Sequence, residues 1–482
     1  MSDYRHYING RWVDGDGTRT LEVVNPASEE TFVRLRAASV AQAREAIHAA
    51  RRAFDEGPWP RMAPRERSRT LYQLADELRR RERELIDLTV REAGCTVGLA
   101  HTIQVTFPID HMYYFAEQAA RSTVEALPPV EGPMSMSSMV VREPIGVIAA
   151  ITPWNFPFFL ALWKVGHALA TGNTIVLKPA SYTPLTALEI ARAAEAVDLP
   201  PGVLNVVAGG GSEIGEELAQ SPLVDKISVT GSTEVGRRVM QLGAGNIKRL
   251  ALELGGKSAA IVLDDADLDK VTSACLMGFL IHSGQACGAS TRILVPGALH
   301  DALVERMVGM APFLTVGDPA DMTTVVGPLI RAEHRARVEH YVRRGLEEGA
   351  TLACGGKRPE HLTKGFYLEP TIFTGVDNRM TIAQEEIFGP VGVVIPFTDD
   401  ADAVRIANDS IYGLAGSVYS GNTARALAVA RQVRTGTMMV NGGGINPHAP
   451  FGGYKQSGIG REMGRYGLDA YTEIKHVGIG LM

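Results

Sequence analysis

The sequence predicts an α/β protein built on parallel sheets with crossover helices. Short apolar runs alternate with helix-length segments between residues 146 and 254, and the runs read VIAAI, TIVLK, VLNVV, KISVT and KRLALEL. This alternation is typical of buried parallel strands joined by helices. A second series, AAIVL, RILVP, PTIF and VGVVIPF, indicates a second α/β domain that begins near residue 255. The length of 482 residues also favours at least two domains.

Helices are expected on both sides of these strands. Residues 40–53 and 64–93 are predicted to be helical, because apolar residues in the second segment recur with the i, i+3, i+4, i+7 spacing of a core-facing stripe. Residues 297–311 and 331–348 are the helix-like stretches of the second series. Residues 126–144 are rich in proline and then alternate, which favours an excursion that ends in an exposed strand.

The charge of the chain argues against two classes of partner. A net charge of -6 and a pI near 6.1 provide no general attraction for nucleic acid or anionic lipid. Residues 144–163 carry no charged side chain and reach the length of a membrane span, but Pro153, Asn155 and Pro157 would break its helical hydrogen bonds. We therefore expect a buried strand, a turn and a helix start there, and neither nucleic acid nor a membrane as a partner.

The cysteines indicate a reducing compartment. Four of them lie far apart without a C-x-x-C pair, so neither a disulfide framework nor a zinc ribbon is indicated, and we expect no metal ion. The first residues, MSDYRHYINGRW, carry charges where the apolar core of an export signal would lie. A cytoplasmic location is expected.

Two well-known phosphate loops are excluded, and a weaker candidate remains. GGKS at 255–258 would end a Walker A loop, but Ala251 stands where its first glycine belongs, and no G-x-G-x-x-G occurs. In KISVTGSTEVG a predicted strand leads into Gly231, Ser232 and a helix. Ser232 is a good N-cap, and the free N–H groups of a helix N-terminus can bind a pyrophosphate. The alternative is that this segment is an ordinary strand, turn and capped helix that binds no ligand.

Three residues could do chemistry. Cys287, in HSGQACGAS, lies between Gly284 and Gly288, so a carbonyl could reach its sulfur, although a packed core thiol is the alternative. Glu253 ends an apolar strand, where burial would raise its pKa toward that of a general base; it could instead cap the next turn. Asn155, between fixed prolines, could donate to an oxyanion or satisfy the turn.

Seven strings, in register along the chain, resemble the aldehyde dehydrogenase superfamily: TPWNFP, LKPASYTP, TGSTEVG, ELGGKS, GQACGAS, EEIFGPV and PFGGYKQSGIGRE. The resemblance implies two Rossmann-like α/β domains plus a small β oligomerisation excursion. Residues 1–122 and 145–254 would form the cofactor-binding domain, 123–144 and 472–482 the oligomerisation element, and 255–471 the catalytic domain. It also implies a homodimer or homotetramer.

The resemblance assigns roles to the catalytic candidates. Cys287 matches the nucleophile that forms a thiohemiacetal and then a thioester, and Asn155 with the backbone N–H of Cys287 matches the oxyanion hole. Glu253 matches the general base that activates water, and Glu462 matches a carboxylate of a proton relay. Enzymes that pass the acyl group to coenzyme A typically lack this glutamate, so a hydrolytic, non-acylating enzyme is favoured. The rivals are an acylating enzyme, a cysteine hydrolase that uses His282 without nicotinamide, and a silent binding protein.

The resemblance also implies a nicotinamide cofactor. The matching positions lie around the pyrophosphate and neighbouring strand ends, at the adenosine ribose, and at the nicotinamide ribose and ring: Trp154, Gly231, Ser232, Leu254, Lys178, Glu386 and Phe388. Strict NAD users often carry glutamate where Ser181 stands here, and that charge repels a 2′-phosphate. We therefore expect NAD as the cofactor, with NADP tolerated.

The substrate positions implied by the same match are aromatic or aliphatic: Phe107, Phe156, Phe159, Trp163, Ile445 and Phe451. Such a wall favours an apolar aldehyde, aromatic, terpenoid or medium-chain, over a carboxylated or cationic one. The alternative is that several of these phenylalanines pack the domain interface.

Overall fold

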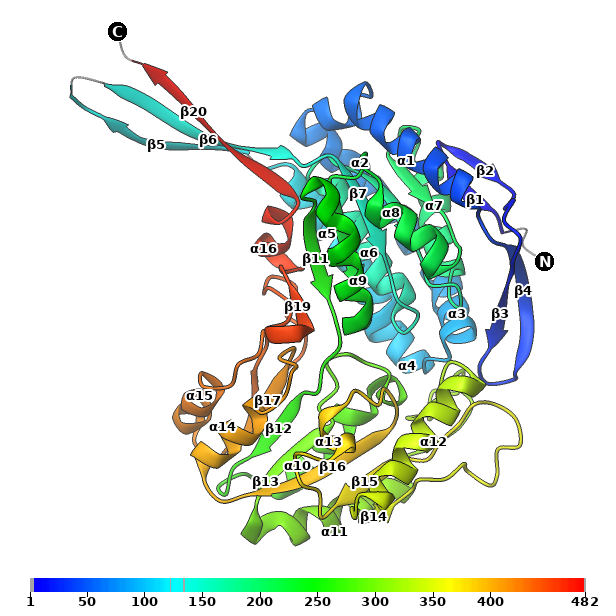
Figure 1. The fold of residues 1–482 in the computed structure, drawn as a ribbon, viewed down its shortest axis with the longest axis vertical. Helices are drawn as coiled ribbons and strands as arrows, with labels where there is room; N and C mark the ends of the chain where they lie inside the picture. The colour runs from blue at the N-terminus through cyan, green and yellow to red at the C-terminus, as the bar shows by residue number, and fades with distance from the viewer. Residues whose placement is uncertain (1–3, 122, 133–134, 481–482) are drawn as a thin grey trace.

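Two large sheets and a projecting three-stranded sheet organise the described residues, 4–121, 123–132 and 135–480, of the computed structural model (Figure 1). The α/β fold class expected from the sequence is confirmed. The predicted segments 1–122, 123–144 and 472–482 include residues 1–3, 122, 133–134 and 481–482, which lie outside the described residues.

The first sheet contains the first predicted strand series. Its order is β19-β11-β10-β7-β8-β9-β1-β2, and the five central strands run parallel. The strands are β7 (Val147–Ile151), β8 (Thr174–Lys178), β9 (Leu204–Val206), β10 (Lys226–Thr230) and β11 (Arg249–Glu253), with antiparallel edges β1 (His6–Ile8), β2 (Arg11–Val13) and β19 (Gly458–Ile459). The chain therefore returns to this sheet near its end, inside the segment 255–471.

Helices cover both faces of the first sheet. The apolar core on one face includes side chains of α2 (Pro64–Arg80), α5 (Thr106–Ala119), α6 (Pro157–Ala170) and α7 (Leu185–Ala196). The core on the other face includes side chains of α1 (Val40–Asp55), α8 (Glu216–Gln220) and α9 (Thr233–Gly243). The hairpin of β3 (Thr20–Asn25) and β4 (Glu30–Arg36) lies beside α3 (Glu82–Ala93), and α4 (Val97–Leu99) follows α3.

The segment 64–93, predicted as helical, is divided into α2 and α3 at Arg81. The backbone of Arg81 leaves the helical region, with φ -92 and ψ 1, and its N–H approaches the carbonyls of Glu77 and Leu78. Leu78 and Leu85 are both buried, so the tightened turn keeps the apolar stripes of both helices on the core. Such a local turn leaves the apolar periodicity almost unchanged, which is why the sequence pattern does not show it.

The second sheet contains the second strand series, in the order β14-β15-β16-β13-β12-β17-β18. Its strands are β12 (Ala259–Val262), β13 (Arg292–Pro296), β14 (Thr351–Cys354), β15 (Thr371–Thr374), β16 (Val391–Phe397), β17 (Gly416–Tyr419) and β18 (Met439–Val440). The accompanying helices are α10 (Leu268–Leu280), α11 (His300–Met310), α12 (Ala332–Glu347), α13 (Thr381–Gln384), α14 (Asp400–Asn408) and α15 (Thr423–Ala430). The predicted helices 297–311 and 331–348 correspond to α11 and α12.

A three-stranded sheet projects from the body of the molecule (Figure 1). β6 (Met136–Pro144) pairs antiparallel with both β5 (Val124–Val130) and β20 (Thr472–Gly480), the strand that follows α16 (Gly464–Asp469). The apolar segment 144–163 forms β7, a turn and α6, as expected from its prolines. Within the described ranges, no helix is long and apolar enough to cross a membrane.

Candidate active site

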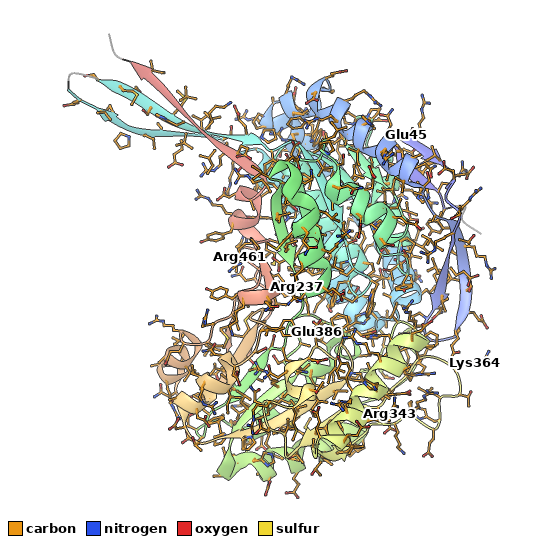
Figure 2. All side chains as sticks on the ribbon, viewed as in Figure 1. Glu45, Arg237, Arg343, Lys364, Glu386 and Arg461 are labelled. Atoms are coloured by element: carbon orange, nitrogen blue, oxygen red, sulfur yellow. The ribbon has the colours of Figure 1, made fainter. Side chains whose placement is uncertain are left out.

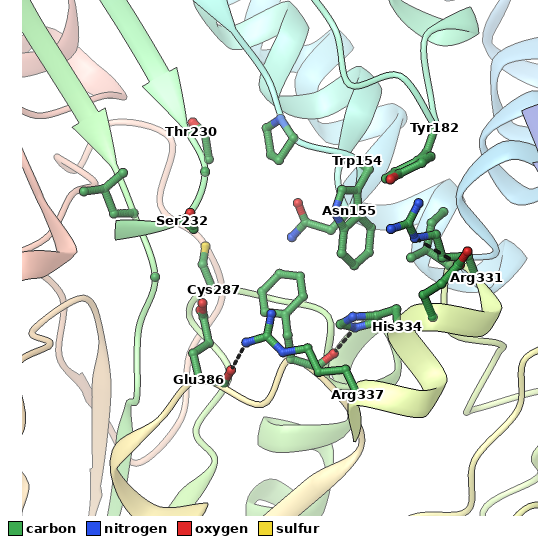
Figure 3. Close-up of a pocket in the computed structure, with 17 residues that line it drawn as sticks. Trp154, Asn155, Tyr182, Thr230, Ser232, Cys287, Arg331, His334, Arg337 and Glu386 are labelled. Carbon is green, nitrogen blue, oxygen red and sulfur yellow. Dashed lines mark hydrogen bonds and ion pairs between the residues drawn. The ribbon is translucent and has the colours of Figure 1, made fainter. Parts of the chain in front are cut away.

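A cavity of about 320 Å³ lies between the carboxyl edge of the first sheet and the first turns of α12 (Figure 3). Parallel strands end at the same edge of a sheet, so the loops that follow β7, β10 and β11 meet there. The cavity is also reached by the cysteine loop and by the loop before β16. The predicted residues that line it are Trp154, Asn155, Gly231, Ser232, Leu254, Cys287, Glu386 and Phe388.

One wall of the cavity is the N-terminus of α9. Ser232 is the N-cap residue of that helix, and its Oγ accepts a hydrogen bond from the N–H of Val235 at 3.2 Å. Gly236 allows α9 to pack on Leu254, because a Cβ at Gly236 would lie 2.5 Å from Leu254 Cδ1. The remaining free N–H groups of the first turn can accept an anion such as a diphosphate.

Cys287 and Asn155 lie on the same cavity, and Figure 3 shows the Asn155 amide directed toward the side that holds Cys287. Asn155 Nδ2 donates to the backbone carbonyl of Gln285 at 2.8 Å, and Gln104 Nε2 donates to the backbone carbonyl of Asn155 at 3.2 Å. Gln285 is itself buried and accepts from the N–H of Ile330 at 2.9 Å. The amide is thus held in place, with its second N–H available to an oxyanion.

The thiol of Cys287 is protonated in this state. Burial raises the pKa of Cys287 to about 12, and the charges of Glu386 and Glu253 act in the same direction. A thiol is a weak nucleophile compared with its thiolate, so a base must take the proton before the sulfur can attack a carbonyl.

Two glycines allow close packing around the cysteine. A Cβ on Gly256 would lie 2.4 Å from the carbonyl oxygen of Cys287, and a Cβ on Gly255 would lie 2.6 Å from Glu386 Oε2. The N–H of Gly256 donates to Glu386 Oε1 at 3.0 Å. The double glycine of ELGGKS therefore lets Glu386, which lies between the two lobes in Figure 2, approach the cysteine loop.

Phe388 lines the cavity with a strained backbone. Its φ is 65°, which is uncommon for a residue other than glycine and occurs often at functional sites. The Phe388 ring lies 5.4 Å from the ring of Trp154, and the Phe388 carbonyl is 2.7 Å from His334 Nε2. These contacts hold the aromatic floor of the cavity in one geometry.

Glu253 ends β11 and is 3% exposed. Neither of its carboxylate oxygens has a hydrogen-bond partner among the described residues. Burial raises the pKa of Glu253 well above its usual value, and the charge of Glu462 adds to the effect. Gly452 makes room for this carboxylate, since a Cβ there would lie 2.7 Å from Glu253 Oε1. A buried, unpartnered carboxylate with a raised pKa is suited to proton transfer near neutral pH.

Glu462 is part of a buried charged network. Lys164 Nζ lies 2.5 Å from Glu462 Oε1 and 2.9 Å from Ser228 Oγ, and Ser228 Oγ donates to Glu462 Oε1 at 3.0 Å. Burial alone would raise the pKa of Glu462, but the charge of Lys164 and the hydrogen bonds from Lys164 and Ser228 outweigh it, so the pKa is lowered. The network therefore favours a negative charge on Glu462 near Glu253.

Lys178 and Ser181 do not line the cavity. Lys178 ends β8, and burial lowers the pKa of its ammonium group to about 8. Lys178 Nζ donates to the Pro179 carbonyl at 3.1 Å, and Ser181 Oγ donates to the Gly209 carbonyl at 3.0 Å. Both residues thus lie at the carboxyl end of β8, beyond the cavity.

The predicted substrate residues form an aromatic cluster outside the cavity. Centre-to-centre distances are 5.7 Å for Phe107 and Phe159, 4.1 Å for Phe159 and Trp163, 6.1 Å for Phe156 and Phe159, and 6.2 Å for Trp163 and Phe451. Phe156 also contacts the His282 ring at 5.5 Å, which connects the cluster to the cysteine loop. Ile445 differs from the others, because it lies on an exposed loop and is 41% exposed.

Several site residues were absent from the sequence expectations. Tyr182, Arg331, His334 and Arg337 line the cavity, and His111 packs on Phe107 and Trp163 in the aromatic cluster. Tyr182 lies within LKPASYTP but was not singled out there, and none of the quoted strings contains the other four. Lys164 had a detectable signal, since it is the first charged residue after the apolar run 144–163.

A cavity at the carboxyl edge of a parallel sheet, with a capped helix N-terminus on its wall, defines an α/β protein with a dinucleotide-type site. Residues 12–477 match the aldehyde dehydrogenase family. Betaine aldehyde dehydrogenase of Bacillus subtilis (strain 168) is 42% identical over 477 residues, which cover 98% of this chain and 96% of that protein. A 3-succinoylsemialdehyde-pyridine dehydrogenase of a Pseudomonas species is 42% identical over 481 residues, covering 99% of each.

A solved structure of the Staphylococcus aureus betaine aldehyde dehydrogenase in complex with NAD+ has a TM-score of 0.96 and 38% identity, covering 99% of this chain and 95% of that one. Another structure of that enzyme holds NAD+ and a BME-modified cysteine. The chain belongs to the aldehyde dehydrogenase family and is an oxidoreductase, so the family and enzyme class predicted from the sequence are confirmed. The NAD+ in these structures agrees with the expected cofactor.

Proposed function

We propose that this protein is a hydrolytic aldehyde dehydrogenase that uses NAD to convert an apolar aldehyde into its carboxylic acid. One observation carries the proposal. Cys287 and the anchored amide of Asn155 share a cavity with a capped helix N-terminus and the Glu386 carboxylate, while the unpartnered carboxylate of Glu253 is buried beside it.

Acylation begins at Cys287. Loss of its proton to solvent gives a thiolate that adds to the aldehyde carbon and forms a thiohemiacetal. The second Nδ2–H of Asn155 and the backbone N–H of Cys287 stabilise the negative charge that develops on the aldehyde oxygen. Bound NAD supplies the two-electron oxidation that leaves an acyl thioester on Cys287.

Deacylation requires an activated water. Glu253 accepts a proton from water, the resulting hydroxide adds to the thioester carbon, and the carbon–sulfur bond breaks to release the acid and free Cys287. The raised pKa of Glu253 makes its carboxylate a stronger base than an exposed glutamate. We propose that Glu462, held by Lys164, passes the proton onward.

The residues of the cavity fit a nicotinamide dinucleotide. The α9 N-terminus at Ser232 suits its diphosphate, the Glu386 carboxylate suits a ribose hydroxyl pair, and the strained Phe388 and Trp154 offer flat faces for a ring. Lys178 and Ser181 lie further along, where the adenosine ribose would bind. Ser181 carries no charge against a 2′-phosphate, so we expect NADP to be accepted more weakly than NAD.

The competing chemistries have less support. A cysteine hydrolase needs a histidine that activates Cys287, but no hydrogen bond joins Cys287 to a histidine in the described ranges, and burial lowers the pKa of His282 to about 3. An acylating enzyme has no use for a water-activating Glu253. Addition of coenzyme A is therefore expected to leave the rate of NADH formation unchanged.

The apolar substrate is supported by the aromatic cluster around Trp163. Among its members is the imidazole of His111, whose pKa burial lowers to about 3, so it is neutral near pH 7. A second candidate is a quaternary ammonium aldehyde, because aromatic faces such as those of Trp163 and Phe451 can bind a cation. The name of the Bacillus subtilis relative favours this candidate.

A substrate panel separates the two candidates. We would measure kcat/KM for 3-phenylpropanal, betaine aldehyde and succinic semialdehyde with NAD and without coenzyme A, and identify the acid formed. We expect 3-phenylpropanal to exceed both charged aldehydes by at least about tenfold, because the cluster buries apolar area. Phe451→Leu keeps apolar volume but removes an aromatic face, so it should reduce turnover of the cationic aldehyde more than that of 3-phenylpropanal. A higher kcat/KM for betaine aldehyde would instead support the second candidate.

We further propose the domain roles and assembly expected from the sequence. Residues 1–122 and 145–254 would bind the cofactor, and 255–471 would carry the cysteine. The strands within 123–144 and 472–482 expose Leu127, Val130 and Ile474, which suits contact with a second copy in a homodimer or homotetramer. All four cysteines are free, which suits the reducing cytoplasm.

A further inference from the structure

The mouth of the cavity is bridged by a contact between its two walls. Tyr182 follows β8 in the first sheet, whereas Arg331 is the N-cap residue of α12, whose apolar face packs with the second sheet. The guanidinium carbon of Arg331 lies 4.0 Å from the centre of the Tyr182 ring. This is a cation–π contact, and both residues line the cavity (Figure 3).

The exposure of the two side chains places the bridge at the rim. Tyr182 is 36% exposed and the Arg331 side chain is 37% exposed. A second contact between the walls joins Trp154 and His334, whose ring centres are 5.2 Å apart. Arg331 Nε is also 3.4 Å from a carboxylate oxygen of Glu333, but that side chain is 73% exposed, so the ion pair adds little. The Tyr182 ring is therefore the main contact that orients the guanidinium.

The charge on this side of the cavity suits an anionic ligand. Arg331, the N-cap of α12, and Arg337, in its second turn, both line the cavity, and the α9 N-terminus at Ser232 lies on another wall. A ligand with a diphosphate between these groups would be attracted from both sides. The carboxylates of Glu333 and Glu386 also line the cavity, so the two arginines provide local positive sites and not a net positive charge.

We propose that Tyr182 and Arg331 form a clasp over the cofactor and set how long the dinucleotide stays bound. This inference rests on the proposed function, which places a nicotinamide dinucleotide in the cavity. Because the clasp crosses the mouth, it has to open each time the dinucleotide enters or leaves. Weakening it speeds the dissociation of NADH.

The test is the dissociation rate of NADH, measured by stopped-flow fluorescence on the full-length protein after mixing with excess NAD. Tyr182→Leu removes the aromatic face and Arg331→Gln removes the charge. We expect each to raise the rate about three- to tenfold, as loss of a cation–π contact at a partly exposed site implies. The double variant should be no faster than the faster single variant, because both changes break the same contact.

Two control variants separate the clasp from simpler effects. Tyr182→Phe keeps the ring and should retain the wild-type dissociation rate. Arg343→Gln removes the same charge from an exposed position of α12 outside the cavity (Figure 2) and should also leave the rate unchanged. An unchanged rate in Tyr182→Leu would overturn the clasp, even if Arg331→Gln were faster, since Arg331 would then act as an isolated charge. A wild-type protein that binds no NADH would contradict the proposed function itself.

Discussion

Replacement of Glu253 by glutamine should slow the enzyme and stabilise the fold. The carboxylate is 3% exposed, and neither oxygen has a partner among the described residues. A buried group without a hydrogen bond destabilises a protein by about 1–3 kcal/mol, and more when it is charged. The glutamine amide would also be buried without partners, but it carries no charge, so we expect the free energy of unfolding of Glu253→Gln to exceed that of the wild type by at least about 1 kcal/mol near pH 8.

The stability difference should depend on pH in a defined direction. The pKa of Glu253 is raised in the folded protein by burial and by the charge of Glu462, whereas the unfolded chain titrates near the usual value of about 4.3. Between these two values the folded state holds a proton that the unfolded state has lost. The free energy of unfolding of the wild type therefore falls as pH rises through this window. That of Glu253→Gln does not fall for this reason, because glutamine does not titrate.

Although Glu253→Gln should make the fold more stable, it should make the enzyme slower. Loss of a general base typically slows the step that it assists by about 10²–10⁴-fold, or about 3–5 kcal/mol in the barrier. Urea unfolding at several pH values gives the stabilities, and rapid-quench kinetics gives the rate of each step. A variant that is less stable than the wild type at pH 8 would show that the carboxylate has a stabilising partner, and a steady rate equal to the wild type would refute its role as the base.

Three further outcomes are expected from the same site. Cys287→Ala should abolish turnover yet bind NADH with wild-type affinity in a fluorescence titration, because its side chain is needed only for the covalent steps. Lys164→Met should lower the free energy of unfolding in urea by about 3–5 kcal/mol, since it leaves the buried Glu462 charge unpaired, and adding Glu462→Gln should recover part of the loss. Ser181→Glu should raise the KM for NADP at least about tenfold with little change for NAD, because the new charge repels only the 2′-phosphate; equal changes for both cofactors would mean that Ser181 lies away from that phosphate.

The fold was largely predictable because buried parallel strands have a strong local signature. Runs such as TIVLK and KISVT are mostly apolar or β-branched over the length of a strand, and they form β8 and β10. The break of the 64–93 segment at Arg81 was not predictable, because the two helices keep a continuous apolar stripe. The return of β19 to the first sheet was also hidden, since two residues carry no periodicity.

Some residues of the site could also be predicted from the sequence, and others could not. Cys287, Glu253 and Asn155 lie in strings that the family resemblance covers, so their grouping could be expected from the sequence. Arg331 and Tyr182 meet only because α12 packs on the second sheet and turns its first residues toward the first. Because the two residues are far apart in the sequence, no local sequence pattern predicts their contact. The same holds for Lys164 and Glu462, which are 298 residues apart and form a pair only in the folded protein.

The mass of the trapped enzyme tests most simply whether Cys287 carries the acyl group. Glu253→Gln, mixed with NAD and an apolar aldehyde and quenched in acid, should carry an adduct on the Cys287 peptide equal to the aldehyde less two hydrogen atoms, the mass of an acyl thioester. One equivalent of NADH should form in the same burst. An unmodified Cys287 peptide together with NADH formation would show that oxidation bypasses this sulfur and would contradict the central claim.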